Sequence, residues 1–195
     1  MKRMSVIALV LLASWCCMAG TTVDFRDAKP KSGEKVPKGW KSKGTDSDVP
    51  ETVFSIKNDE QGKPVLHMKS AKGKGGIIKE FDNIDLNKTP IMQWKWKAIT
   101  LPKGGDGRFD DKGDQAIDIY VITGGLISQK AIMYTYETDT PKDASKSFSL
   151  YLGAFKCKWF CVRNKEDGTG KWFVDERNIA KDFKEFIRVT GMTHV

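Results

Sequence analysis

Hydrophobic and polar residues alternate in short segments along most of the chain after its first twenty residues. An alternation of period two is typical of β-strands that bury one face, and turn-forming clusters such as Asp167-Gly168 separate the segments. Strands are predicted at 22–25, 52–58, 65–70, 76–81, 91–99, 116–123, 131–137, 147–152, 155–163 and 171–176. This number of short strands predicts an all-β protein in which two sheets pack as a β-sandwich.

One segment near the C-terminus has the periodicity of an amphipathic helix instead. Between Asn178 and Arg188 the apolar residues recur at intervals that place them on one helical face. These residues are Ile179, Ala180, Phe183, Phe186 and Ile187. Asn178 is a suitable N-cap. We expect this helix to cover the end or back of the sandwich, with Phe183 and Phe186 inserted into the core.

The segment from Met92 to Ala98 divides cleanly into an apolar face, which carries Trp94 and Trp96, and a polar face. The polar face consists of Gln93, Lys95 and Lys97. Two tryptophans on one strand face are compatible with a platform on which sugar rings stack. The core interpretation is favoured, because Met92 and Ala98 on the same face are typical core residues.

The first twenty residues resemble a secretory signal peptide. Lys2 and Arg3 precede an apolar stretch at residues 6–13, and small residues then lead to a predicted cleavage before Gly20. We therefore expect a periplasmic protein without a transmembrane span in its mature chain. The alternative is a lipid anchor on Cys16 or Cys17, which the bulky residue just before Cys16 disfavours.

Residues 20–195 are long enough for one domain and short for two. The formal net charge of +8 contains no block of five or six basic residues, so it is weak evidence for any particular partner. Solvated lysines on strand faces explain most of the excess. No nucleic-acid partner is expected in that compartment.

The histidine count limits the possible chemistry. His67 and His194 are the only histidines, so a zinc site or a Ser/His/Asp triad would have to use one of two scattered residues. No Gly-rich phosphate loop is present. The sequence therefore predicts no cofactor and favours a protein that is not an enzyme.

Cys157 and Cys161 remain after the predicted cleavage. Four residues of extended strand span ~13 Å, whereas the Cα atoms of a disulfide lie within ~7 Å. Two buried thiols are therefore favoured. A tight turn at 158–160 would instead permit a disulfide.

The segment 101–114 is rich in carboxylates and is longer than a hairpin requires. Carboxylate oxygens in a loop suit Ca²⁺, but the spacing of these aspartates matches no calcium signature. Arg108 and Lys112 also neutralise the run. We expect a solvated loop without a metal. The aspartates are Asp106, Asp110, Asp111 and Asp114.

Tyrosines recur in two successive predicted strands, 116–123 and 131–137. If their rings line one concave surface near the polar face of 92–98, they form a strip that suits a saccharide. An alternative remains open, in which these tyrosines are rim or core residues with satisfied hydroxyl groups. The predicted ligand-binding residues are Asp118, Tyr120, Tyr134, Tyr136, Gln93 and Lys95.

Five blocks of sequence carry a resemblance to a known family. They are Val36-Pro-Lys-Gly-Trp40, Pro90-Ile-Met-Gln-Trp-Lys-Trp-Lys97, Gly113-Asp-Gln-Ala-Ile-Asp-Ile-Tyr-Val-Ile122, Tyr134-Thr-Tyr136, and Gly170-Lys-Trp-Phe-Val-Asp-Glu-Arg-Asn-Ile179 with Asp182, Phe183 and Phe186. In this order they resemble DUF 3047, a bacterial envelope family of unknown function. The resemblance implies a jelly-roll fold similar to galactose-binding-like and carbohydrate-binding modules, and no established activity.

The chain departs from that family pattern in three places. Tyr136 stands where the family has tryptophan, and Gln115 follows Asp114 where a second aspartate is usual. The sequence also ends at Val195, which leaves open whether the sandwich lacks a C-terminal edge strand.

Together these observations predict an exported, non-catalytic binding module whose ligand is an envelope glycan or another saccharide. One alternative is an accessory or structural envelope protein that binds another protein through the same sheet face. The other is a carbohydrate-active enzyme, which would need two carboxylates facing each other across a cleft.

Overall fold

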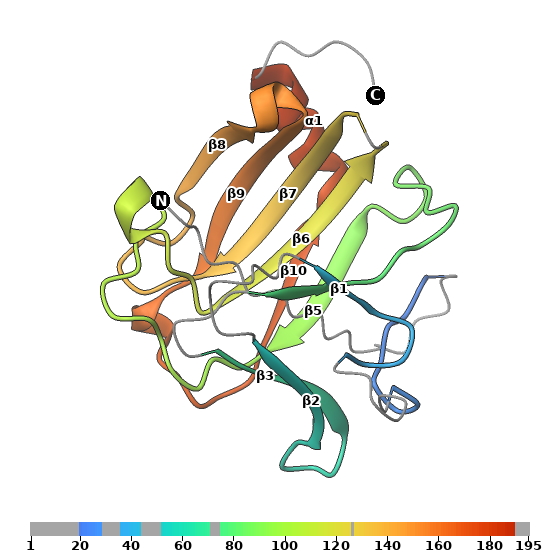
Figure 1. The fold of residues 1–195 in the computed structure, drawn as a ribbon, viewed down its shortest axis with the longest axis vertical. Helices are drawn as coiled ribbons and strands as arrows, with labels where there is room; N and C mark the ends of the chain where they lie inside the picture. Colours follow the sequence, from blue (N-terminus) through green and yellow to red (C-terminus); the bar gives the residue numbers. More distant parts are fainter. Residues whose placement is uncertain (1–19, 29–35, 44–51, 71–74, 126, 190–195) are drawn as a thin grey trace.

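The computed structural model describes residues 20–28, 36–43, 52–70, 75–125 and 127–189 (Figure 1). The expected signal peptide, with Cys16 and Cys17, lies outside these residues, as does His194. The regular elements are β1 (Lys41–Lys43), β2 (Val53–Asn58), β3 (Pro64–Lys69), β4 (Gly76–Ile78), β5 (Ile91–Trp96), β6 (Ile117–Gly124), β7 (Gln129–Tyr136), β8 (Ser145–Leu150), β9 (Phe155–Arg163), β10 (Phe173–Asn178) and α1 (Ile179–Val189).

The largest sheet has four strands in the order β6-β7-β9-β8. β6 and β7 pair antiparallel, as do β8 and β9, whereas the two central strands β7 and β9 run parallel. The remaining strands form the antiparallel pairs β5–β10, β2–β3 and β1–β4. The prediction of an all-β, sandwich-like fold with one C-terminal helix is confirmed, and the jelly-roll strand order stays a prediction.

The main core lies between the four-stranded sheet and the β5–β10 pair. Trp94 stacks on Tyr134 with 5.0 Å between ring centroids, and the Trp96 and Tyr136 rings lie 5.7 Å apart. All four side chains are at most 2% exposed. The alternation in β5 places both tryptophans on the face that meets this sheet, so aromatic packing joins the two layers.

The helix α1 covers one end of the same core, opposite the end that carries the β2–β3 hairpin (Figure 1). Asn178 caps it, because its Oδ1 accepts a hydrogen bond of 2.9 Å from the backbone N–H of Lys181. Phe183 and Phe186 are buried with Trp94 in the main core. In the part of the chain that the structure describes, no helix has the length and apolar character to span a membrane.

A second core joins the small sheets. Val23, Phe25 and Trp40 are buried with Leu66 and Ile77. The strand predicted at 22–25 is wrong, because Val23 and Phe25 fill this core from irregular backbone. β1 was not predicted, because its three residues are polar and exposed and show no alternation.

A third cluster lies on the other face of the four-stranded sheet and contains Met133 and Trp159 with both cysteines. Cys157 and Cys161 are buried, free thiols, which confirms that prediction. Burial is the main reason that the pKa of the Cys161 thiol rises to about 12.

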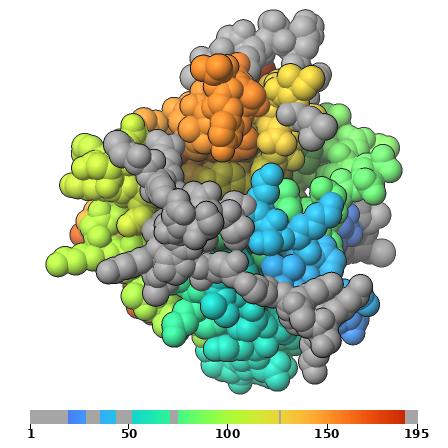
Figure 2. Space-filling model, in the orientation of Figure 1, coloured from blue at the N-terminus to red at the C-terminus, as the bar shows by residue number. Residues whose placement is uncertain are grey.

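Two chain reversals lie next to each other at the α1 end of the four-stranded sheet. One connects β6 to β7, and the other is the short 3₁₀ segment η2 (Tyr151–Gly153) between β8 and β9. The backbone N–H of Gln129 donates a hydrogen bond of 2.7 Å to the carbonyl of Ala154, which joins the two. The space-filling view shows the orange and yellow residues of these reversals side by side (Figure 2).

Candidate functional site

A groove of about 800 Å³ lies between the β2–β3 hairpin, the end of β5 and the segments 97–102 and 114–117. Its most buried apolar lining residues are Leu66, Trp96 and Ala98. We call it the hairpin groove. Its other apolar lining residues are Val65, Met68, Ile99, Leu101, Pro102, Ala116 and Ile117.

Trp172 forms an aromatic wall of this groove. The ammonium groups of Lys95 and Lys97 lie 4.5 and 4.9 Å from its ring centroid, and its Nε1–H donates a hydrogen bond of 2.9 Å to Glu60 Oε2. Lys95 projects from the outer face of β5, opposite Val174 of β10. The polar face predicted for 92–98 therefore meets an indole ring just before β10.

Two carboxylates of the β2–β3 turn bind the same lysines. Asp59 accepts hydrogen bonds from the backbone N–H groups of Gln61 and Lys63 and lies 3.5 Å from Lys95 Nζ, while Glu60 pairs with Lys97. The Lys97 hydrogen bond is the main cause that lowers the pKa of Glu60 to about 2. The pKa of Asp59 is also lowered, chiefly by the backbone N–H of Lys63. Both groups are therefore ionised and bound to neighbours at neutral pH.

The β2–β3 hairpin presents a basic face to the groove. The register pairs Ser55 with His67, Lys57 with Val65 and Val53 with Lys69, so His67 shares one face with both lysines. The His67 Nδ1 lies 3.4 Å from Ser55 Oγ. Burial lowers the pKa of His67 first, and the charges of Lys57 and Lys69 lower it further. The two ammonium groups therefore create a positive potential where the imidazole lies, and this favours a bound anion.

The ligand-binding residues predicted from the sequence do not share one surface. Gln93 and Lys95 lie on the outer face of β5, where the Gln93 amide lies 3.5 Å from Glu176 Oε2. Lys95 lines the hairpin groove, and Gln93 does not. These two residues are thus separated from the tyrosines by the thickness of the β5–β10 layer.

Tyr134 and Tyr136 lie on the inner side of that layer and are both 0% exposed. The Tyr134 hydroxyl donates a hydrogen bond of 2.7 Å to Asp182 Oδ2, and the Tyr136 hydroxyl donates one to the Gly168 carbonyl. The expectation that their rings face a saccharide is therefore wrong. They belong to a central strand that is buried on both faces, which is the core alternative with satisfied hydroxyl groups.

Asp118 and Tyr120 lie on a third face. Asp118 is opposite Thr135 and Tyr120 is opposite Met133, so both project away from Tyr134. Asp118 is also buried. The predicted concave strip therefore does not form. The register between β6 and β7 places Asp118 and Tyr120 on one face of the sheet and Tyr134 and Tyr136 on the other.

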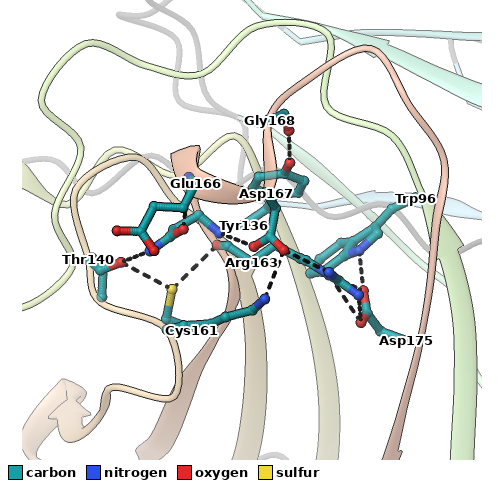
Figure 3. Close-up of polar contacts among 11 residues, drawn as sticks. Trp96, Tyr136, Thr140, Cys161, Arg163, Glu166, Asp167, Gly168 and Asp175 are labelled. Carbon is teal, nitrogen blue, oxygen red and sulfur yellow. Dashed lines mark hydrogen bonds and ion pairs between the residues drawn. The ribbon is translucent and has the colours of Figure 1, made fainter.

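A network around Arg163 connects β5, β9 and β10 beside the main core (Figure 3). The Arg163 guanidinium binds Asp175 through Nε and Nη2, with Nη2 2.6 Å from Asp175 Oδ1, and its Nη1 lies 2.8 Å from Asp167 Oδ1. Trp96 Nε1–H donates a hydrogen bond of 2.7 Å to Asp175 Oδ2. Its groups bind one another, so the network stabilises the packing of the strands.

The carboxylate-rich loop is only partly solvated. Asp110, Asp111 and Asp114 are exposed, but Asp106 is buried and bound by Arg108, whose hydrogen bonds lower the pKa of Asp106 to about 2. The expectation of a fully solvated loop is therefore wrong for Asp106. Among the residues that the structure describes, no group of three His, Cys, Asp or Glu side chains is arranged to hold a metal ion.

Trp172 is a site residue that was not predicted from the sequence, although the sequence contains a signal for it. In the predicted strand 171–176, Trp172 falls on the same face as Val174 and Glu176, and these two residues are exposed on the outer face of β10. A tryptophan in phase with exposed positions indicates an aromatic ring near the surface. Its neighbours Lys95 and Lys97 could not be assigned without the pairing of β5 with β10.

A family model described as "Protein of unknown function (DUF3047)" matches residues 38–192. This range contains the hairpin groove, the main core and α1. Neither the curated proteins nor the solved structures contain a match to the chain.

Proposed function

Because the chain belongs to the DUF3047 family, which brings no assigned activity, we propose a function from the hairpin groove itself. The protein is a non-catalytic binding protein of the cell envelope, exported by its N-terminal signal sequence, and its ligand is a saccharide that carries an anionic group. The observation that carries this proposal is one groove that combines an apolar lining, the Trp172 ring and the basic face around His67.

The lining of the groove suits a sugar. A volume of about 800 Å³ is within the ~300–1,000 Å³ that small-molecule sites commonly have. Sugar rings present apolar C–H faces that pack on indole rings and aliphatic side chains, here Trp172, Leu66 and Ile117. Lys95 lines the same wall and supplies a donor for hydroxyl oxygens.

The charges of the groove favour an anionic substituent. Four lysines and three carboxylates line the groove, and two of the carboxylates, Asp59 and Glu60, are already paired with Lys95 and Lys97 while Asp114 is exposed. The exposed Lys57 and Lys69 create a positive potential at His67. A carboxylate bound beside His67 would be attracted by both ammonium groups.

Two carboxylates of the groove, Asp59 and Glu60, support a binding role over hydrolysis. A glycosidase needs a general acid that keeps its proton near neutral pH, and this requires a raised pKa. The pKa values of Asp59 and Glu60 are shifted in the opposite direction. These two residues therefore position Lys95, Lys97 and Trp172.

Calorimetric titration with an acidic oligosaccharide, oligogalacturonate, and a neutral one of equal length tests the proposal. The acidic ligand is expected to bind more tightly, and Trp172→Ala is expected to weaken it about ten-fold or more. The double variant Lys57→Ala/Lys69→Ala should abolish the preference for the acidic ligand. Tyr151→Ala, at an exposed position that does not line the groove, is the matched control.

Equal affinity for the two oligosaccharides would overturn the anionic part of the proposal. No binding of either ligand, together with a protein that copurifies with the wild type but not with Trp172→Ala, would instead assign the groove to an accessory protein. Release of reducing sugar from either ligand would contradict the non-catalytic role.

A further inference from the structure

The α1 end of the four-stranded sheet displays the most exposed apolar side chains of the described residues. Leu152, Ile127 and Tyr151 are 110%, 88% and 79% exposed. They come from the two adjacent reversals between β6 and β7 and between β8 and β9. We call these three residues the apolar tip. Single exposed apolar residues are ordinary, but three on adjacent reversals form a local feature.

The backbone holds two of these side chains in a conformation that residues with a Cβ seldom adopt. Tyr151 and Leu152 have φ angles of 52° and 55°. A hydrogen bond of 3.1 Å from the Ala154 N–H to the Tyr151 carbonyl closes this turn, and the Gln129–Ala154 hydrogen bond joins it to the neighbouring reversal. Disfavoured backbone that is held by its surroundings tends to occur at functional positions.

The two chain segments that carry the apolar tip are basic. The segments 121–132 and 145–158 contain four lysines and no aspartate or glutamate. Lys130 and Lys156 are directly opposite each other on β7 and β9, next to the two reversals. The other two, Lys146 and Lys158, pair with Asp110 and Glu185.

We propose that the apolar tip is a membrane-contact site that inserts Leu152, Ile127 and Tyr151 between anionic lipid headgroups, with Lys130 and Lys156 at the level of the phosphates. Leucine and isoleucine gain from burial at the acyl boundary, and tyrosine prefers the interface. The two lysines complement the negative surface of the lipid. This site is distinct from the hairpin groove and does not depend on the ligand proposed there.

A lipid surface fits these observations better than a protein partner does. The apolar tip consists of only three exposed apolar side chains, whereas protein interfaces are extended, closely packed patches. Lys130 and Lys156, next to the two reversals, complement a negative bilayer. A second copy of this chain would bring the same positive charge to the contact and would be repelled.

Vesicle flotation tests the site. Binding of the wild type is measured on vesicles of phosphatidylcholine alone and on vesicles that also contain about 30% phosphatidylglycerol, which makes their surface negative. Binding is expected on the anionic vesicles and is expected to weaken as salt is raised. Because residues 6–13 are themselves apolar, every variant is prepared with the same N-terminus as the wild type.

Leu152→Ser and Ile127→Ser should each weaken binding about ten-fold, and Lys130→Gln and Lys156→Gln about five-fold each. Leu152→Trp should strengthen binding, which an unfolded variant would not do. Val53→Ser changes a residue that is 61% exposed elsewhere and should bind as the wild type does.

Unchanged binding of Leu152→Ser and Leu152→Trp would overturn the proposal, as would equal binding to both kinds of vesicle. Dimers that Leu152→Ser abolishes, seen in solution without vesicle binding, would assign the apolar tip to self-association instead.

Discussion

The Tyr134 hydroxyl donates a hydrogen bond of 2.7 Å to Asp182 Oδ2, and this bond joins the middle of the four-stranded sheet to the C-terminal helix. Arg177 binds the same carboxylate through Nε and Nη2, at 3.0 and 2.8 Å. The three groups come from β7, β10 and α1. This buried polar contact therefore fixes the helix on a core that is otherwise aromatic.

Removal of the Tyr134 hydroxyl and removal of the Asp182 carboxylate should lower the free energy of unfolding by different amounts. Tyr134→Phe loses one hydrogen bond but leaves Asp182 bound to Arg177, so a loss of about 1 kcal/mol is expected. Asp182→Ala leaves the Arg177 guanidinium and the Tyr134 hydroxyl without their acceptor, and roughly 3 kcal/mol is expected. Urea unfolding measures both, with the exposed Tyr151→Phe as a control that should change nothing.

The same tyrosine should make stability depend on pH in the alkaline range. Burial, followed by the Asp182 carboxylate, raises the pKa of Tyr134 above its ordinary value of 10.0. Above about pH 10 the unfolded chain releases this proton while the folded protein retains it, so stability should fall as pH rises. Urea unfolding between about pH 9 and 11 should show a shallower fall for Tyr134→Phe. Equal slopes would contradict this assignment.

Truncation of Trp96 and of Trp172 to alanine should destabilise the protein to different extents. Trp96 is 2% exposed and donates a hydrogen bond to Asp175, so Trp96→Ala should destabilise the fold by roughly 3–5 kcal/mol. Trp172 is half-buried at the groove, so Trp172→Ala should lower the free energy of unfolding by less than Trp96→Ala does. Thermal unfolding monitored by circular dichroism compares them. A Trp96→Ala protein that melts with the wild type would disprove the core role.

The cysteines should be unreactive until the protein unfolds. Cys157 and Cys161 are both buried. The pKa of the Cys161 thiol is raised to about 12, so this thiol forms almost no thiolate at pH 8. Iodoacetamide without reductant should leave both unmodified in the native protein and alkylate both in urea. Peptide mass spectrometry at these two positions reads the result, and a peptide resistant in urea would indicate a disulfide.

His67 should report on the hairpin groove. Because its pKa is lowered in the folded protein, unfolded chains take up the proton first, and stability should decrease as pH falls below about 6.5. NMR titration of the imidazole should give a higher pKa in Lys57→Ala and in Lys69→Ala. A bound oligogalacturonate should also raise it, whereas a pKa unchanged by both lysine variants would show that burial alone sets it.

The local pattern of the sequence identified much of the fold. The alternation at Trp94 and Trp96 and the periodicity around Phe183 and Phe186 depend only on neighbours within one element. The strand β9 begins and ends where the sequence predicted it. Local patterns are sufficient for such features because side-chain direction is fixed by the backbone of each element.

The candidate site depended on relationships that no local pattern contains. Tyr120 and Tyr134 each alternate correctly within their own strands, yet the register pairs Tyr120 with Met133. Lys95 meets Trp172 only because β5 pairs with β10, which lies far along the chain. The register and the choice of strand partner therefore determine which side chains meet, and both are set by tertiary packing.

The pairing of β5 with β10 has a consequence for the order in which the protein is made. During synthesis, Trp94 and Trp96 leave the ribosome long before Phe173–Asn178, the strand that they pair with. Their rings have no complete layer to enter until the last strand and helix are released. In the later part of its elongation, a nascent chain of this protein therefore exposes indole rings that holding chaperones can bind.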